Sequence, residues 1–262
     1  MNSYDKLNQL FNNQKNNLCV GLDPDYTKLP QGFEQNPDGI YNFLIEIINV
    51  TKDLAIAYKI NFAFYEVFGS KGIEIIEKIL PKIPTDKFVI ADVKRSDIGN
   101  SSKFYAESIY KHFGFDSATL NPLMGAESLE PFFKYTDKLN FVLALTSNPG
   151  SKDFLNNYNF FPNLFREIIR KFTELYSEKN LGFVAAAIKP EETMNVRLLA
   201  PNYVLLVPGI GAQGGDLKQI NKQKIMPAIF NVSRDIIFPD AKEDYFKAVR
   251  EKAIEYSKLM AL

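Results

Sequence analysis

The sequence contains one cysteine, one histidine and no net charge, and each of these shortages excludes a class of function. Cys19 alone can form no internal disulfide, which is typical of a reducing compartment, and it excludes cysteine-based zinc and iron–sulfur sites. Because His112 is the only histidine, clusters of histidine ligands and a second Ser-His-Asp site are excluded as well. The 31 basic and 31 acidic side chains balance, so no general attraction to nucleic acid or to an anionic membrane is expected.

Targeting segments and membrane spans are also missing from the pattern. Residues 1–17 are polar and rich in Asn and Gln, without the apolar core of a signal peptide. The longest charge-free run, residues 198–215, contains two prolines and four glycines and indicates a strand followed by a loop. We therefore expect a cytoplasmic protein with no membrane and no nucleic-acid partner.

What the 262 residues do contain is an alternation of short apolar runs and longer amphipathic stretches. Nearly continuous apolar runs are typical of parallel strands that are covered by helices. The expected strands are residues 18–23, 55–62, 88–94, 117–121, 141–147, 183–187, 203–207 and 228–233. The expected helices are residues 39–54, 73–80, 97–113, with Asp97 as N-cap, 164–176 and 244–259.

Eight such alternations predict an α/β fold, a (β/α)8 TIM barrel that forms a single domain over residues 1–262. The alternative is a doubly wound open sheet, which normally has five or six strands in fewer residues. In a barrel the chemistry lies at the carboxyl ends of the strands. Polar residues follow nearly every expected strand here, which predicts a ring of site residues around the barrel mouth.

The third expected strand carries the most informative charges. Asp92 and Lys94 are two residues apart and should point to the same side, whereas Val93 and Arg95 should face the other way. Lys59 ends the neighbouring strand, and Asp97 follows at the next helix. Two lysines and two aspartates would form a net-neutral array that holds an ammonium and a carboxylate at one reacting centre. A structural ion-pair network and a Schiff-base lysine are the alternatives.

A second motif follows the seventh expected strand, where residues 209–214 read Gly-Ile-Gly-Ala-Gln-Gly. A dinucleotide fingerprint of this form belongs in the first unit of a Rossmann domain, so its place here is wrong for that function. In a barrel the loops after the seventh and eighth strands bind phosphate. Gln213 and Arg234, beside Ser233, could hold a phosphate monoester, although the glycines could also be simple turn formers.

Isolated residues receive plainer interpretations. His112 is expected on the surface near a helix end. Cys19 is expected to be a buried, inert thiol.

Together these motifs resemble one family, the orotidine 5′-monophosphate decarboxylases. The resemblance rests on Leu22-Asp23-Pro24, Lys59, Asp92-x-Lys94-x-x-Asp97-Ile98, Thr146-Ser-Asn-Pro-Gly150, Pro208-Gly-Ile-Gly-Ala-Gln-Gly-Gly-Asp216 and Ser233-Arg234. These motifs occur in the family's order from about residue 18 to residue 235. The long spacings, and residues 59–66, are similar to the longer bacterial and protozoan branch.

The resemblance implies decarboxylation of orotidine 5′-monophosphate to uridine 5′-monophosphate without a metal or cofactor, the last step of pyrimidine biosynthesis. Lys94 would donate the proton to C6, and Asp92 would lie beside the scissile carboxylate, held by Lys59 and Lys94. Asp97 would reach across a homodimer interface to the ribose of the partner's site, with Ile98 and Ser101 behind it. Ser101 stands where many members have threonine, which puts only its packing role in doubt.

The same resemblance assigns substrate-binding roles to the remaining motif residues. Asp23 and Asn61 would hold ribose or phosphate-side groups, Ser147 the pyrimidine amide, and Gln213 with Arg234 the phosphate; Pro208 and Ser233 belong to the same binding motifs.

Two other functions stay open. Metal-dependent sugar-phosphate relatives of the same superfamily share the D-x-K-x-x-D element, but they have a glutamate ligand where this chain has Lys59. A barrel that binds a phosphate ligand without turnover is the alternative from another class.

Overall fold

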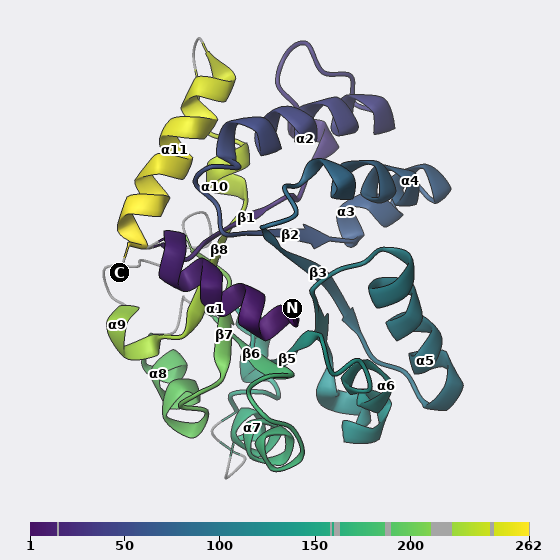
Figure 1. Ribbon diagram of the computed structural model, residues 1–262, viewed down its shortest axis with the longest axis vertical. Helices are drawn as coiled ribbons and strands as arrows, with labels where there is room; N and C mark the ends of the chain where they lie inside the picture. The colour runs from purple at the N-terminus through teal and green to yellow at the C-terminus, as the bar shows by residue number, and fades with distance from the viewer. Residues whose placement is uncertain are drawn as a thin grey trace.

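Eight parallel strands pair with their neighbours in chain order and close into a barrel, which the helices surround (Figure 1). The computed structural model describes residues 1–14, 16–157, 159, 163–186, 190–210, 222–241 and 244–261. The strands are β1 (Leu18–Gly21), β2 (Ala57–Asn61), β3 (Phe88–Arg95), β4 (Ser117–Leu120), β5 (Leu139–Leu145), β6 (Leu181–Ala185), β7 (Val204–Val207) and β8 (Ala228–Val232). The predicted barrel is confirmed, and the open sheet is excluded because β1 pairs with β8.

All eight expected strands are present, and their ends differ from the prediction by at most two residues. The difference that matters most for the site lies at the carboxyl end of β8. This strand stops at Val232, and Arg234 begins a short helix instead of ending the strand as predicted.

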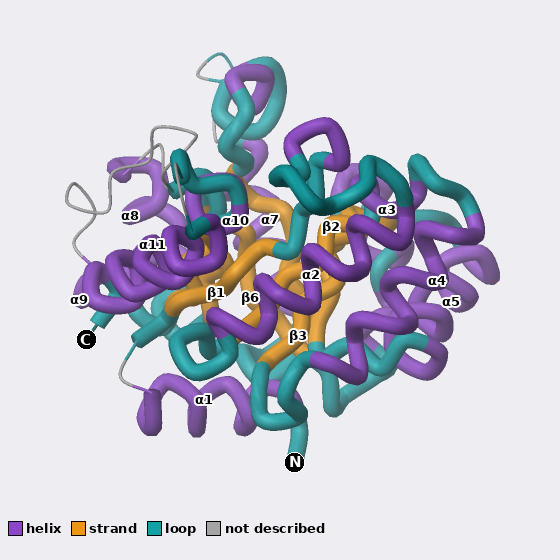
Figure 2. The backbone as a smooth tube through the Cα atoms, turned by 90° about the horizontal axis from the view of Figure 1, so that it is seen from above, coloured by secondary structure: helices purple, strands orange, loops and turns teal. Residues whose placement is uncertain are grey.

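The helices surround the barrel, except α1, which lies across its amino-terminal end (Figure 2). They are α1 (Ser3–Gln14), α2 (Pro37–Thr51), α3 (Ala63–Glu66), α4 (Ser70–Ile79), α5 (Gly99–Glu107), α6 (Glu130–Phe133), α7 (Leu164–Leu175), α8 (Pro190–Leu199), α9 (Lys222–Ile225), α10 (Arg234–Ile237) and α11 (Tyr245–Leu259). None of the described helices is long and apolar enough to cross a membrane.

Local chemistry explains where the helices begin. Helix α2 starts two residues before the expected Gly39, because Asn36 accepts a hydrogen bond from the Gly39 N–H (2.9 Å) and Pro37 suits the first turn. Asp244 caps α11 in the same way. The prediction of Asp97 as a helix N-cap was wrong.

At that point the chain turns before it enters the helix. Gly99, with φ of +51°, is the first residue of α5, and Ile98 occupies the cap position. The carboxylate of Asp97 accepts a hydrogen bond from the Ile98 N–H instead (2.8 Å). The expected helix 97–113 is also divided, because a π-helical turn, Ser108–His112, follows α5.

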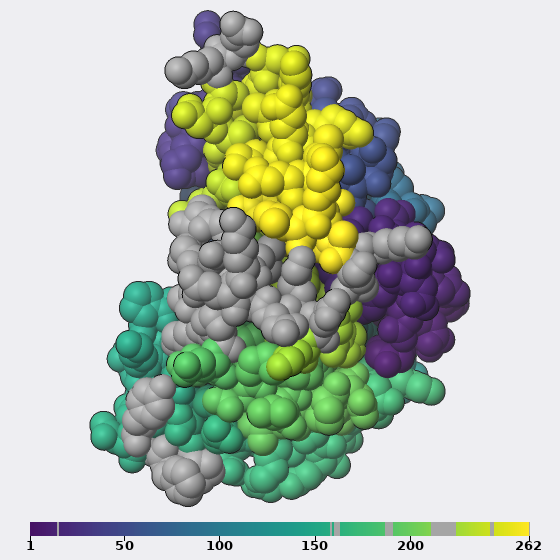
Figure 3. Space-filling view, turned by 90° about the vertical axis from the view of Figure 1, so that its left-hand side faces the viewer, coloured from purple at the N-terminus to yellow at the C-terminus, as the bar shows by residue number. Residues whose placement is uncertain are grey.

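The inside of the barrel is an apolar core that α1 covers at the amino-terminal end. Leu7, Leu10 and Phe11 of α1 belong to the same buried cluster as Phe88 and Phe141 from the strands. Figure 2 shows α1 beneath the strands, at the end opposite the loops that follow their carboxyl ends. This helix was not among those predicted from the sequence. An antiparallel bridge joins Asn16, just after α1, to Ala261, just after α11, and Figure 3 shows the purple amino-terminal segment beside the yellow carboxy-terminal segment.

A buried arginine forms hydrogen bonds to the segments that precede β7 and β8. Arg197 of α8 is 5% exposed, and its guanidinium donates to carbonyl oxygens before both strands. These acceptors belong to Ala200, Pro201, Tyr203, Ile225 and Pro227. Burial lowers the pKa of Arg197 to about 10, so the group stays charged at neutral pH. The carbonyl dipoles satisfy this charge at the end of the barrel away from the mouth.

Candidate active site

A cavity of about 670 Å³ opens at the carboxyl ends of the strands, where the sequence predicted it. Its lining includes nine of the predicted site residues, namely Asp23, Lys59, Asn61, Asp92, Lys94, Ser147, Pro208, Ser233 and Arg234. Thr119, Leu143, Val184, Leu206 and Asn231 also line it. The strand-end residues therefore meet in one space, as a closed barrel requires.

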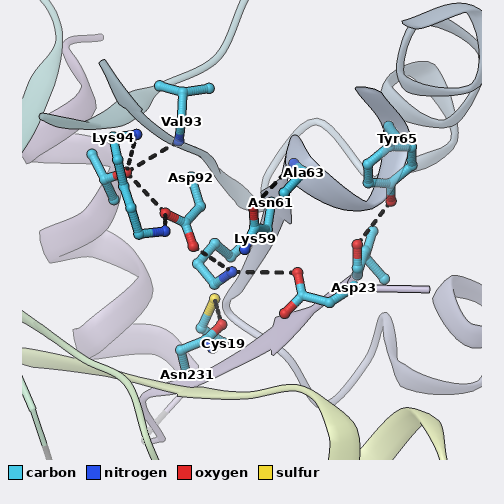
Figure 4. Close-up of polar contacts among 12 residues, drawn as sticks. Cys19, Asp23, Lys59, Asn61, Ala63, Tyr65, Asp92, Val93, Lys94 and Asn231 are labelled. Carbon is cyan, nitrogen blue, oxygen red and sulfur yellow. Dashed lines mark hydrogen bonds and ion pairs between the residues drawn. The ribbon is translucent and has the colours of Figure 1, made fainter. Parts of the chain in front are cut away.

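The charged groups form one continuous chain across this cavity (Figure 4). The Nζ atom of Lys94 lies 2.6 Å from Oδ1 of Asp92. The other carboxylate oxygen of Asp92 accepts from Nζ of Lys59 at 2.9 Å. Lys59 in turn lies 3.4 Å from Asp23. Positive and negative groups thus alternate from Lys94 to Asp23. Within one chain the fourth charged residue of the array is Asp23 and not Asp97, which was expected there.

Mutual stabilisation keeps the buried members of this array charged. Burial alone would raise the pKa of Asp92, but the ammonium groups of Lys59 and Lys94 outweigh it and hold that pKa well below its usual range. Burial would also lower the pKa of Lys59, but Asp23 and Asp92 outweigh this effect and raise it above the usual range. Lys59 is therefore an ammonium at neutral pH, which argues against a role for it as a Schiff-base nucleophile.

An irregularity in β3 directs these side chains. The pairing register between β3 and β4 shifts between Ala91 and Arg95, and Lys94 has φ of +47°. Lys94 nevertheless reaches the cavity, whereas Arg95 pairs with Glu66 on the other side of the strand and Val93 joins the outer core. Asp92 and Lys94 thus lie on the cavity side of β3 and Val93 and Arg95 on the other, as predicted, although the pairing of β3 with β4 is irregular here.

Hydrogen bonds from neighbouring residues hold the carboxyl ends of β1 and β2 in place beside the cavity. The Tyr65 hydroxyl donates to the carbonyl of Leu22 at 2.8 Å, which holds the segment that carries Asp23. The Asn61 side chain accepts from the Ala63 N–H at the start of α3 (3.2 Å). Cys19 is fully buried beneath Lys59, as predicted, and burial raises the pKa of its thiol.

The opposite end of the cavity has the character of an anion site. Arg234 is exposed at the start of α10, and Ser233 precedes it with a hydroxyl that has no hydrogen-bond partner within the described part of the chain. Gly21 makes room for this residue, because a Cβ there would lie 2.7 Å from Cβ of Ser233. Gly209, with φ of +91°, turns the chain after β7. Gln213 lies outside the described residues.

Three predicted residues lie away from the cavity. Asp97 and Ser101 flank the start of α5, and Ile98 between them is 60% exposed. None of the three is among the residues that line the cavity. His112 also lies on the surface as predicted, where its Nε2 atom is 2.8 Å from Glu77.

Comparison with known proteins identifies the family to which this chain belongs. The model of the orotidine 5′-phosphate decarboxylase / HUMPS family matches residues 16–248. The chain belongs to this family. An orotidine 5′-phosphate decarboxylase of Bacteroides fragilis is 41% identical over 262 residues, which cover 96% of each chain. The resemblance seen in the sequence is therefore confirmed.

Solved structures agree with the family assignment. The OMP decarboxylase of Leishmania donovani has a TM-score of 0.83 and 30% identity, and the match covers 99% of each chain. The UMP synthase of the same organism has a TM-score of 0.86 and 32% identity over 99% of this chain, which spans 57% of that longer protein. The decarboxylase fold thus occurs both alone and within a longer chain.

Proposed function

We propose that this protein decarboxylates orotidine 5′-monophosphate to uridine 5′-monophosphate and carbon dioxide, without a metal or cofactor. The observation that carries this proposal is the alternating array Lys94–Asp92–Lys59–Asp23 in a cavity whose other end presents Arg234 and Ser233. Membership of the decarboxylase family supports the same substrate. The phosphate would bind at Arg234 and the reacting ring above Lys94.

Lys94 is the group that carries the chemical step. Loss of carbon dioxide from C6 breaks a C–C bond and leaves an electron pair in the plane of the ring, where the π-system cannot delocalise it. An ammonium beside that carbon stabilises the developing charge and then donates a proton to it. Lys94 fits this role because its side chain is 49% exposed to the cavity and Asp92 fixes its Nζ atom. Asp92 would lie beside the carboxylate that leaves.

The position of Lys59 supports a reaction without a divalent cation. Its ammonium lies within 3.4 Å of Asp23 and 2.9 Å of Asp92. A metal ion that used these two carboxylates would have to displace a buried ammonium that already satisfies them.

The residues around Asp97 support a homodimer. Ile98 is 60% exposed, Phe104 is 61% exposed and Leu123 is 59% exposed. The α5 segment is tied to the loop after β4, because the Ser102 hydroxyl donates to the carbonyl of Ser128. These neighbouring apolar side chains would be covered by a second copy, which would bring Asp97 and Ser101 to the partner's ribose site.

The absorbance change of orotidine 5′-monophosphate in the presence of EDTA tests the proposal directly. A fast fall that EDTA leaves unchanged would support the metal-free decarboxylase. Activity only with added magnesium and a sugar phosphate would favour the metal-dependent relatives. Tight binding without turnover would assign a binding protein instead.

A further inference from the structure

Thr119 of β4 makes three hydrogen bonds at the centre of the site, and no role in the site was predicted for it from the sequence. Its side chain is 2% exposed. Its Oγ1 atom accepts from the N–H of Val93 at 3.1 Å and from the N–H of Lys94 at 3.0 Å. The same hydroxyl donates to Oδ1 of Asp92 at 2.9 Å. One side chain therefore links the backbone of Lys94 to the carboxylate of Asp92.

The bulge in β3 explains why a side chain is needed here. Between Ala91 and Arg95 the register with β4 shifts, so the regular ladder does not provide acceptors for the intervening N–H groups. A buried N–H without a partner is costly. Thr119 supplies the missing acceptor from the neighbouring strand and so stabilises the backbone conformation in which Lys94 has φ of +47°.

The hydrogen-bond inventory of a hydroxyl fixes the direction of the third contact. A threonine hydroxyl has one hydrogen and two acceptor lone pairs. Two N–H donors occupy the lone pairs, so the hydrogen points to Asp92. Oδ1 of Asp92 then accepts from both Thr119 and Lys94, while Oδ2 accepts from Lys59. The carboxylate is held on three sides and cannot rotate without breaking one of these contacts.

We propose that Thr119 is a positioning residue for decarboxylation, which holds the Asp92 carboxylate and the Lys94 backbone in one fixed unit. The inference rests on the proposed function, because positioning matters only if Lys94 and Asp92 act on the substrate. Removal of the hydroxyl should misplace both groups while leaving the phosphate end of the cavity intact. Removal of the hydroxyl should therefore lower kcat and leave KM nearly unchanged.

Two substitutions separate the hydroxyl from the methyl group. In Thr119→Val, which is close in shape, kcat should fall about 100-fold, as expected for a misplacement near 1 Å, while KM changes less than about threefold. Thr119→Ser keeps the hydroxyl and should recover most of kcat. Thr51→Val is the matched control, because Thr51 is fully buried and hydrogen-bonded to Ile47 and Tyr58 away from the cavity. Its kcat should equal that of the unmodified protein.

Hydrogen exchange tests the same contacts without any turnover. The amides of Val93 and Lys94 should exchange at least about tenfold faster in Thr119→Val than in the unmodified protein, and Thr119→Ser should restore their protection. If the valine variant does not fold, Thr119→Ala replaces it, since the vacated space can admit water to the two N–H groups.

The outcomes keep the two proposals apart. A valine or alanine variant with unchanged kcat, or a serine variant as slow as the valine variant, would overturn the positioning role. Unchanged amide exchange in both would overturn it as well. Absence of decarboxylation by the unmodified protein would instead overturn the proposed function, whatever the exchange rates show.

Discussion

The Nζ atom of Lys94 lies 2.6 Å from Oδ1 of Asp92, a residue that precedes it by two positions on the same strand. Adjacent positions on one face of a strand would ordinarily keep two side chains parallel and separated. Here the pairing of β3 with β4 is irregular and Lys94 has φ of +47°, and its side chain contacts the carboxylate. The proposed proton donor, Lys94, and the carboxylate proposed to lie beside the leaving group, Asp92, are thus held together within one short segment.

The substitution Lys94→Ala should abolish turnover and leave the fold intact. Asp92 keeps its ion pair with the buried Lys59, and the Lys94 side chain is half exposed, so its loss removes little packing. Absorbance of orotidine 5′-monophosphate measures the activity, and circular dichroism measures the fold. Lys111→Ala, on the surface beside Glu107, is the control. Substantial decarboxylation by Lys94→Ala would remove Lys94 from the role of acid.

The variant Asp92→Asn should be destabilised at pH 7, by about 3 kcal/mol, because it leaves Lys59 with one carboxylate in place of two. The pKa of Asp92 is lowered in the folded state. Its stabilisation is therefore present above the unfolded pKa of about 3.9 and is lost as the pH falls toward the folded pKa.

Urea unfolding at two pH values measures this dependence. The stability difference between the unmodified protein and Asp92→Asn should shrink by about 0.7 kcal/mol between pH 7 and pH 3.5. A difference that is constant or grows over this range would contradict an ionised Asp92 in the folded protein.

Replacement of Arg234 by alanine should weaken substrate binding far more than it changes stability. Arg234 is exposed at the start of α10 and makes no hydrogen bond or ion pair through its side chain within the described residues. The loss of a charged contact to phosphate should raise KM by about 10- to 100-fold. The melting temperature should stay unchanged, as it should in the surface variant Arg170→Ala. A variant that no longer folds, as judged by circular dichroism, would refute this assignment.

Mixed dimers test the proposed contribution of Asp97 across the interface. Chains with Lys94→Ala and chains with Asp97→Ala should each be inactive alone. A dimer of one chain of each kind would contain one site with both Lys94 and the partner's Asp97, so mixing after mild dissociation should restore activity. No recovery, with mixed dimers shown by mass spectrometry, would mean that Asp97 acts within its own chain or not at all.

The substitution Arg197→Met should reduce stability without changing catalysis. It leaves the carbonyls before β7 and β8 without their donor, which should cost about 3 kcal/mol. The contacts lie at the opposite end of the barrel from the cavity, so kcat/KM below the melting temperature should be unchanged. Arg250→Met, at an exposed pair with Asp53, should cause a much smaller loss.

Much of the barrel mouth could be predicted from the sequence, because the end of each strand combines an apolar run, which locates the strand, with polar residues that can form a site. Apolar runs locate the strands, and the polar residues at or just beyond their carboxyl ends, such as Asn61 and Ser147, must then lie at the same end of a parallel barrel. The helix α1 escaped this reasoning because its three inward residues, Leu7, Leu10 and Phe11, are scattered among Asn and Gln.

The geometry inside the mouth could not be predicted in the same way. A threonine in an apolar run is an ordinary strand residue, so nothing in the sequence distinguishes Thr119 from a packing side chain. Its role follows only from the bulge in the neighbouring strand, which no local pattern announces. Asp97 had a plausible local role as a helix cap, but Gly99 with φ of +51° delays the start of α5.

The apolar contacts of α1 with the inside of the barrel close the amino-terminal end of the barrel in the part of the chain that the structure describes, and the cavity lies at the other end. Substrate, nucleotide product and carbon dioxide would then all pass through the ring of loops at the carboxyl end. Under the proposed function, entry of the substrate and release of both products would therefore share the carboxyl end of the barrel, so a bound nucleotide would lie between the reacting carbon and solvent.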